Sequence, residues 1–173
     1  GTISTSISNL LIKQGWDLYL LNRGNKNERL LEGVHSLKAD INDEQTVAEL
    51  IKDMTFDVAA DFIGFVPSQL ERDYRLLKGK VNQFIYISSA SAYQKLPADY
   101  RITEGTPLAN PYWEYSRNKI ACEDYLMKLY REESFPVTIV RPSHTYNDWS
   151  VPLGVHGHKG SYQVLKRMLQ GKP

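Results

Sequence analysis

Tyr115 and Lys119 are the residues whose types and spacing best fit acid–base chemistry in this sequence. Because about 3.6 residues make one helical turn, two residues four apart share one face of a helix. An ammonium beside a phenol favours the phenolate, so Lys119 would lower the pKa of Tyr115 from about 10 towards the range of a general acid or base. Ser88 or Ser89, at the end of a strand-like run, could hold the oxygen that is being protonated.

This spacing alone decides little, because it occurs three times. The three pairs are Tyr74/Lys78, Tyr115/Lys119 and Tyr162/Lys166. The first pair lies before the strand that ends at the serines, and the last pair lies after the final strand. Only the middle pair follows the serine strand and opens a helix that returns to the sheet, so we expect the other two pairs on helix surfaces.

The helix that begins near Tyr115 carries one stripe at helical spacing, made of Tyr115, Lys119, Cys122, Leu126 and Leu129. The apolar end of this stripe should face the sheet, where Cys122 is expected as a small core residue. Tyr115 and Lys119 would then face the edge of the sheet at which ligands bind.

Helix-like and strand-like patterns alternate along the chain. The expected strands are 16–21, 34–39, 57–64, 84–87 and 137–140, and the expected helices are 3–14, 42–54, 67–79, 114–132 and 161–170. Asn42 and Gln45 resemble a capping box at the start of the second helix, and Gly15 suits the end of the first. This alternation predicts an α/β fold with a doubly wound parallel sheet, covered by helices on both faces.

The composition limits the class of partner. The 173 residues carry 21 basic and 20 acidic side chains and a net charge of +1, so we do not expect a nucleic-acid partner. No apolar run approaches the roughly 20 residues of a membrane span, so we expect no membrane partner. The single cysteine, Cys122, excludes an internal disulfide and suits a reducing cytoplasm.

Taken in order, the motifs resemble those of the extended, atypical short-chain dehydrogenases/reductases of the NAD-dependent epimerase/dehydratase type. Gly1-Thr2-Ile3-Ser4 resembles the end of that family's glycine-rich phosphate loop, and Ser88 to Tyr93 resemble its Ser-Ser-x-x-Val-Tyr motif. Tyr115-x-x-x-Lys119 is similar to its hallmark pair, and Arg141 to Tyr146 resemble its Arg-Pro-x-Asn-x-Tyr motif. The resemblance implies a Rossmann-like fold with Ser89, Tyr115 and Lys119 as catalytic residues.

The same resemblance implies that NAD or NADP is the cofactor and that its binding residues lie mostly at strand ends. These residues are Gly1, Thr2 and Ile3 at the phosphates, Asn22 and Arg23 at the cofactor ribose, Asp40 and Ile41 at the adenine, Phe62, Ile63 and Gly64 at the strand end where the family has His-Leu-Ala-Ala, Ser88 at the next strand end, Lys119 at the nicotinamide ribose, and Pro142 and His144 near the nicotinamide. Tyr115 would exchange a proton with a small-molecule alcohol or carbonyl substrate as hydride passes, and Ser89 would hydrogen-bond the same oxygen.

Two departures from the family pattern bear on the cofactor. Ser4 stands where the third glycine of the phosphate loop is usual, and we expect binding to survive this change. Asn22 and Arg23 stand where NAD users place an acidic residue, and Arg23 could meet a 2′-phosphate, which favours NADP. A solvated loop arginine is the other interpretation.

Further departures bear on the reaction. Ala90 and Ser91 stand where the family's sugar 4,6-dehydratases carry Asp and Glu, which argues against that chemistry and leaves 4-epimerase, reductase or no catalysis. His144 replaces the usual Asn and is either a proton relay or a structural histidine. His156 and His158 lack a supporting ligand pattern, so we predict no metal site.

The basic residues Arg72, Arg75, Lys78 and Lys80 are expected to form a solvated helix face. We expect residues 1–150 to form the dinucleotide-binding domain without its first strand, and residues 151–173 to start a substrate-binding region. Two functions stay open: an NAD(P)-dependent epimerase or reductase, or a non-catalytic dinucleotide-sensing or RNA-binding protein on the same fold. A homodimer through the helices at 67–79 and 114–132 is also expected from the resemblance.

Overall fold

The computed structural model describes residues 1–24, 32–146 and 162–172, and its elements alternate as the sequence predicts. The strands are β1 (Leu18–Asn22), β2 (Val34–Lys38), β3 (Phe56–Asp61), β4 (Val81–Ile87) and β5 (Val137–Val140). The helices are α1 (Thr2–Lys13), α2 (Glu44–Leu50), α3 (Pro67–Leu77), α4 (Glu114–Glu133) and α5 (Tyr162–Leu169), with a 3-10 turn at Ala90–Ala92.

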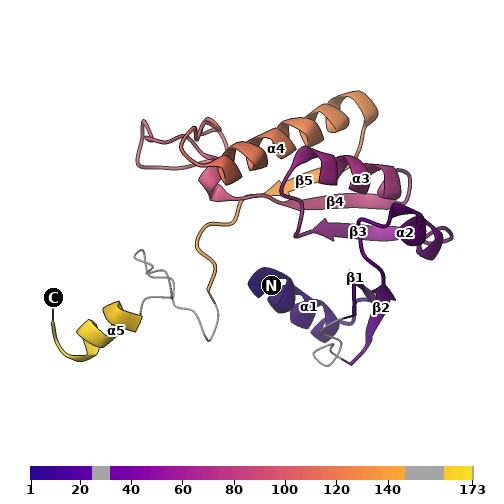
Figure 1. Cartoon of the computed structure of the whole chain (residues 1–173), viewed down its shortest axis with the longest axis horizontal. Helices are drawn as coiled ribbons and strands as arrows, with labels where there is room; N and C mark the ends of the chain where they lie inside the picture. Colours follow the sequence, from indigo (N-terminus) through magenta and orange to yellow (C-terminus); the bar gives the residue numbers. More distant parts are fainter. Residues whose placement is uncertain (25–31, 147–161, 173) are drawn as a thin grey trace.

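All strand pairs in the described residues are parallel, which confirms the α/β class. The strands form two separate ladders, β1–β2 and β3–β4–β5. Side chains connect the ladders: the ring of Tyr19 on β1 lies 6.0 Å from the ring of Phe56 on β3. The carboxyl ends of β3, β4 and β5 lie together beside the start of α4 (Figure 1).

The strand expected at 57–64 ends earlier, at Asp61. One carboxylate oxygen of Asp61 accepts hydrogen bonds from the backbone amides of Ile63 (2.7 Å) and Gly64 (3.0 Å). These bonds fold the chain back on itself, so residues 62–64 form a turn instead of continuing the ladder.

The expected capping box at Asn42 and Gln45 is wrong by one residue. Asp43 is the N-cap of α2, and its carboxylate accepts from the amide and hydroxyl of Thr46. Asn42 is occupied elsewhere, because its side chain bonds to Asp40 and Arg72. Aspartate and asparagine are about equally good caps, so local competition decided between them.

The main core lies between α3, α4 and the sheet of β3, β4 and β5. Its buried members are Leu70, Phe84, Tyr86, Cys122, Leu126, Leu129 and Phe135. The stripe expected on α4 is confirmed, since its apolar residues face this core and Cys122 is a free, buried thiol. A second core joins α2 to α3 through Val47, Ile51 and Leu76, and Leu37 of β2 packs against it.

The two faces of the β3–β4–β5 sheet differ. Helices α3 and α4 lie on one face, whereas α1 lies beside β1 (Figure 1). On the other face Val58 and Val140 are exposed. Within the described residues, therefore, the helical cover expected on both faces is present on only one face of this sheet, because α1 packs against β1.

The expectation of a solvated basic helix face is wrong for Arg72. Its side chain is buried and forms an ion pair with Asp73, with 2.7 Å between the Nη2 and Oδ1 atoms. Arg75 and Lys78 do lie at the surface, where they pair with Glu44 and Glu133.

In the described part of the chain, no helix is long and apolar enough to cross a membrane.

Candidate active site

Lys119 lies on the second turn of α4 with only 1% of its surface exposed. Its ammonium donates hydrogen bonds to the carbonyls of Gly64 (2.7 Å), in the turn after β3, and Ile87 (2.8 Å), at the end of β4. An ammonium has three hydrogens to donate, so one remains for a ligand. Lys119 thereby joins three elements at the carboxyl edge of the sheet.

The charge of Lys119 is set by opposing effects. Burial lowers the pKa of Lys119, while the carboxylates of Asp61 and Glu123 act in the opposite direction. Aromatic rings also face the ammonium, since the Nζ atom lies 4.6 Å from the ring centre of Tyr86 and 5.0 Å from that of Phe65. Carbonyl dipoles and ring faces thus replace the water that burial removes.

Tyr115 is half-buried at the start of α4, one turn before Lys119. Its ring lies between the rings of Trp113 (4.8 Å) and Phe65 (6.3 Å). The Nζ atom of Lys119 lies 5.7 Å from the centre of the Tyr115 ring. The pair therefore shares one helix face as predicted, and the two aromatic neighbours restrict the motion of the tyrosine.

Ser89 follows β4 directly and caps the 3-10 turn. Its Oγ atom accepts hydrogen bonds from the backbone amide of Ser91 (3.2 Å) and from the hydroxyl of Ser91 (2.9 Å). Because both bonds are accepted, the hydroxyl hydrogen of Ser89 remains available for an oxygen in the site. The hydroxyl of Ser89 is therefore placed to donate a hydrogen bond to a ligand.

Ser88 does not share the position of Ser89. Its buried hydroxyl donates to Glu123 (2.5 Å), whose carboxylate also accepts from Arg141, with 2.6 Å between the Oε2 and Nη2 atoms. Arg141 in turn donates to the hydroxyl of Tyr93 (3.2 Å). These bonds raise the pKa of Arg141 further and tie the end of β5 to α4 and to the serine loop.

Asn110 fixes the serine loop against α4. Its buried amide donates to the carbonyl of Ser91 (2.8 Å) and to the hydroxyl of Ser116 (3.3 Å). Since Ser91 bonds to Ser89 and Ser116 follows Tyr115, this side chain sets the separation of the two candidate catalytic groups. No motif in the sequence pointed to Asn110.

An open pocket of about 250 Å³ brings the predicted catalytic residues together. Its lining contains Ile3, Phe62, Ser88, Ser89, Tyr115, Lys119 and Pro142 of the predicted set, and Phe65, Ile87, Ser143 and Thr145 in addition. Five hydroxyl-bearing residues and one lysine therefore line a space with partly apolar walls, an arrangement that suits proton exchange with a bound alcohol or carbonyl.

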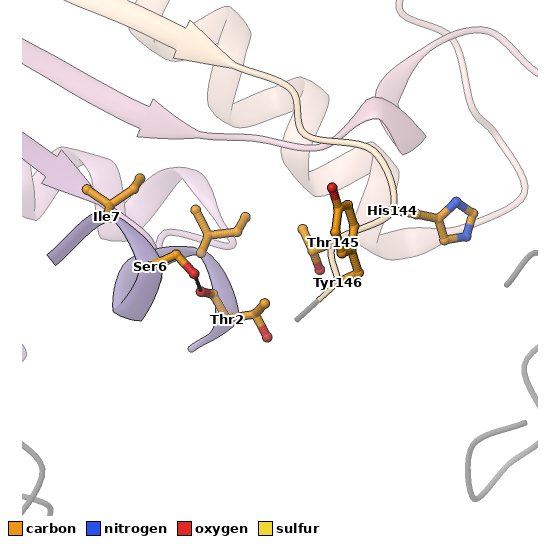
Figure 2. Close-up of a pocket in the computed structure, with 7 residues that line it drawn as sticks. Thr2, Ser6, Ile7, His144, Thr145 and Tyr146 are labelled. Carbon is orange, nitrogen blue, oxygen red and sulfur yellow. Dashed lines mark hydrogen bonds between the residues drawn. The ribbon is translucent and has the colours of Figure 1, made fainter. Parts of the chain in front are cut away.

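A second open pocket, of about 290 Å³, adjoins the first through Ile3 and Thr145. Figure 2 shows Thr2, Ser6 and Ile7 of α1 on one side and residues 144–146 on the other. The imidazole of His144 points away from α1 in this view. Thr2, Ile3 and His144 of the predicted set thus line this pocket together.

The other predicted cofactor residues line neither pocket. They are Gly1, Asn22, Arg23, Asp40, Ile41, Ile63 and Gly64. Asn22 accepts from the amide of Gly24, and Asp40 accepts from both nitrogens of Asn42, so each closes a turn at its strand end. Arg23 is exposed.

Comparison with protein families settles the relationship of the chain. A model described as the NAD dependent epimerase/dehydratase family matches residues 1–172. The chain belongs to this family. A comparison with proteins of curated function gave no match.

Solved structures support the fold of this epimerase/dehydratase-family chain. Pal from Bacillus thuringiensis is similar with a TM-score of 0.72 and 18% identity, over 98% of this chain and 61% of that one. UDP-glucuronic acid 4-epimerase from Bacillus cereus, in complex with UDP-glucuronic acid and NAD, has a TM-score of 0.69 and 19% identity, over 100% and 62%. dTDP-glucose 4,6-dehydratase from Bacillus anthracis, in complex with NAD, has a TM-score of 0.69 and 20% identity, over 99% and 59%.

These likenesses confirm the Rossmann-type fold of the epimerase/dehydratase family. The chain spans about three fifths of the length of each of these structures.

Sequence reasoning missed several lining residues of this family member. Ser143 and Thr145 lie inside the Arg141–Tyr146 motif, so the motif itself was the available signal. Phe65 carried no signal, because only the Asp61 turn brings it beside Tyr115. His156 and His158 lie outside the described residues, within which no cluster of three possible metal ligands occurs.

Proposed function

We propose that this chain is the dinucleotide-binding part of an NAD(P)-dependent epimerase or reductase. Its substrate would be an alcohol or carbonyl compound of the sugar-nucleotide kind. The observation that carries the proposal is the pocket in which Ser89, Tyr115 and Lys119 meet. The complexes of two similar proteins with NAD, one of them also with UDP-glucuronic acid, support the same class of ligand.

The residues present fit a dinucleotide. Thr2 and Ile3 open α1, and the positive end of the dipole at a helix N-terminus favours an anionic pyrophosphate. The remaining N–H of Lys119 suits a ribose hydroxyl, and Ile3 and Pro142 provide apolar walls for a planar ring. When bound, the nicotinamide would supply the hydride chemistry.

In this proposal Tyr115 takes a proton from the substrate hydroxyl and later returns it. The positive charge of Lys119 lies 5.7 Å from the centre of the Tyr115 ring, close enough to attract negative charge that develops there during the exchange. Ser89 donates its hydroxyl hydrogen to the substrate oxygen, because Ser91 already fills its acceptor positions. The chain thus contributes the proton path and the orientation of the oxygen.

Epimerase or reductase chemistry is favoured over 4,6-dehydration. Elimination needs an extra acid and base, whereas Ala90 offers none and the hydroxyl of Ser91 is engaged with Ser89. The exposed Arg23 leads us to favour NADP over NAD.

The wider assignments follow from the same proposal. Residues 1–150 would form the dinucleotide-binding domain, and the boundary to 151–173 lies outside the described residues. We also propose a homodimer that uses α3 and α4, because Tyr125 and Met127 are half-exposed on α4. We place the protein in the cytoplasm, because its single cysteine, Cys122, is a free thiol.

The test is a fluorescence titration of the full-length protein with NADH and NADPH, followed by a screen of sugar nucleotides for turnover. We expect micromolar binding of at least one cofactor and turnover that depends on Tyr115. If the protein binds neither cofactor, the proposed enzymatic function is refuted and the RNA-binding alternative remains. Normal binding with no turnover on any substrate, in wild type and Tyr115→Phe alike, would support a dinucleotide sensor instead.

A further inference from the structure

Asp61 contains a buried oxygen that its surroundings do not satisfy. The residue is 8% exposed, and its Oδ1 atom accepts from the amides of Ile63 and Gly64. Its Oδ2 atom has no hydrogen-bond partner among the described residues. Buried acceptors without a partner are rare and costly, so this oxygen calls for a donor.

The neighbouring carboxyl group of Asp73 can be that donor. Asp73 lies on α3, is 5% exposed, and accepts from the Nε atom of Arg72 (2.8 Å) and from its Nη2 atom (2.7 Å), both at Oδ1. Burial, then the nearby charge of Asp61, raise the pKa of Asp73 to about 7, although Arg72 opposes this. A protonated Asp73 is therefore present near neutral pH.

We propose that Asp61 and Asp73 share one proton, donated by Asp73 to the Oδ2 atom of Asp61, and that this carboxyl pair positions Lys119. The pair acts through the turn at residues 62–64. Asp61 holds the amides of Ile63 and Gly64, and the carbonyl of Gly64 accepts from Lys119. Asp61 and Asp73 are positioning residues, since neither lines the pocket.

Gly64 packs so closely against Asp61 that a movement of the Asp61 carboxylate would also move the turn. A Cβ atom added to Gly64 would clash with the Oδ2 atom of Asp61 and lie 2.8 Å from the Cδ2 atom of Leu70. The carbonyl of Gly64 also accepts from the hydroxyl of Tyr86 (3.1 Å), so the turn is held from both sides. Loss of the shared proton would leave negative charges on both Asp61 and Asp73. Their repulsion would push the turn at residues 62–64 away from Lys119.

The charged and titratable groups that face the pair are few in the described residues. They are Arg72 on α3, Tyr86 on β4, and Lys119 and Cys122 on α4, with Glu44 on α2 beside Arg72 and Glu123 on α4 beside Lys119. The pKa of Tyr86 is raised by burial, so its hydroxyl stays protonated. The carboxylate of Glu123 is already paired with Arg141, and the pKa of Asp73, raised to about 7, places the change in its charge near neutral pH.

The sign of the effect follows from proton linkage. The native protein holds a proton on Asp73 up to about pH 7, whereas the unfolded chain releases it near pH 4. The stabilisation is complete below pH 4 and is lost as the pH rises towards 7 and above. Asp73→Asn mimics the protonated state, because its amide can donate to Asp61 while its oxygen accepts from Arg72.

The experiment compares full-length wild type with Asp73→Asn, Asp61→Asn and the exposed control Asp53→Asn. Urea unfolding is followed from pH 5 to pH 8. We expect the wild-type and control unfolding constants to rise by at least about tenfold more than that of Asp73→Asn over this interval. Carbon-13 NMR of labelled aspartates should show one carboxyl that titrates near pH 7 and is absent in Asp73→Asn. Equal slopes, or no such titration, would overturn the shared proton.

The positioning role rests on the proposed function and has its own measurement. Cofactor affinity of wild type should fall between pH 6 and pH 8, that of Asp73→Asn should be the same at both, and that of Asp61→Asn should be low at both. If Asp61→Asn binds like wild type at both values, Asp61 does not position Lys119. If wild type binds neither cofactor but the carboxyl titrates near pH 7, the proposed function fails while the proton-sharing pair stands.

Discussion

Lys119 on α4 donates a hydrogen bond of 2.7 Å to the carbonyl of Gly64, a residue 55 positions earlier in the chain. A second bond, to Ile87, spans 32 positions. The ammonium is therefore fixed by one backbone carbonyl in the turn after β3 and one at the end of β4 before any ligand arrives. A group that is already held in place loses little conformational freedom when a cofactor binds, which favours affinity.

Tyr115→Phe should remove proton transfer and leave cofactor binding unchanged. The ring would still pack between Trp113 and Phe65, so only the hydroxyl is lost. We expect kcat to fall by about 10²- to 10⁴-fold with an unchanged cofactor Kd. Steady-state kinetics and fluorescence titration check this, with the exposed Tyr130→Phe on the same helix as the control. An equal loss in both variants would contradict the role of Tyr115.

Glu123→Gln should destabilise the fold. The buried carboxylate accepts from Ser88 and from Arg141, and a neutral amide would leave the guanidinium without a counter-charge. We expect a loss of about 3 kcal/mol in the free energy of unfolding, measured by urea denaturation. Glu132→Gln, which breaks only an exposed ion pair with Lys128, should cost less than about 1 kcal/mol. Similar losses for both would contradict the buried network.

Gly64→Ala should distort the turn that holds Lys119. The added methyl group would clash with Asp61 and Leu70, so the turn must move. We expect a loss of about 2 kcal/mol in stability and weaker cofactor binding. Gly105→Ala is the matched control, because a Cβ atom there would meet only the hydroxyl of Thr103, at 3.8 Å. Unchanged binding in Gly64→Ala would separate the turn from the cofactor site.

Arg23→Glu should change the cofactor preference. If Arg23 meets a 2′-phosphate, its reversal should weaken NADPH binding by up to about fivefold, since an exposed ion pair contributes up to about 1 kcal/mol. NADH binding should be unchanged or stronger. Titrations at low and high salt check this, because screening should reduce the difference. Arg131→Glu, the same charge change at the far end of α4, controls for net charge; an equal effect there would refute a direct contact.

Most element positions could be predicted from the sequence, because apolar periodicity and glycine placement are local signals. Gly15 ends α1 with a φ of 77°, as its position predicts, and α4 differs from its predicted range by one residue at its end. The β3 boundary and the α2 cap could not be predicted, since both depend on which of several neighbouring carboxylates and amides bonds to which amide. The burial of Arg72 could not be predicted, because it depends on a contact with Asn42, 30 positions earlier in the chain.

In the candidate site, too, some features could be predicted from the sequence and others could not. Ser89, Tyr115 and Lys119 could be predicted to meet, because strand order places all three at one edge. The support around them could not, since Asn110 and the Asp61–Asp73 pair act through contacts between distant segments. The sequence predicts that the ammonium of Lys119 lies beside the phenol of Tyr115. In the structure the hydrogen bonds of this ammonium go to the carbonyls of Gly64 and Ile87. The predicted cofactor roles of Asn22, Arg23, Asp40 and Ile41 stay predictions.

The separation of the β1–β2 ladder from the β3–β4–β5 ladder has a consequence for amide hydrogen exchange. No backbone hydrogen bond joins β1 to β3 among the described residues, so the two ladders can open without breaking each other. Amides of β1 and β2 should then exchange faster than those of β4, which is bonded on both sides. Addition of NADH or NADPH should slow exchange most at Thr2–Ser6 and at Phe62, where the cofactor would contact the chain.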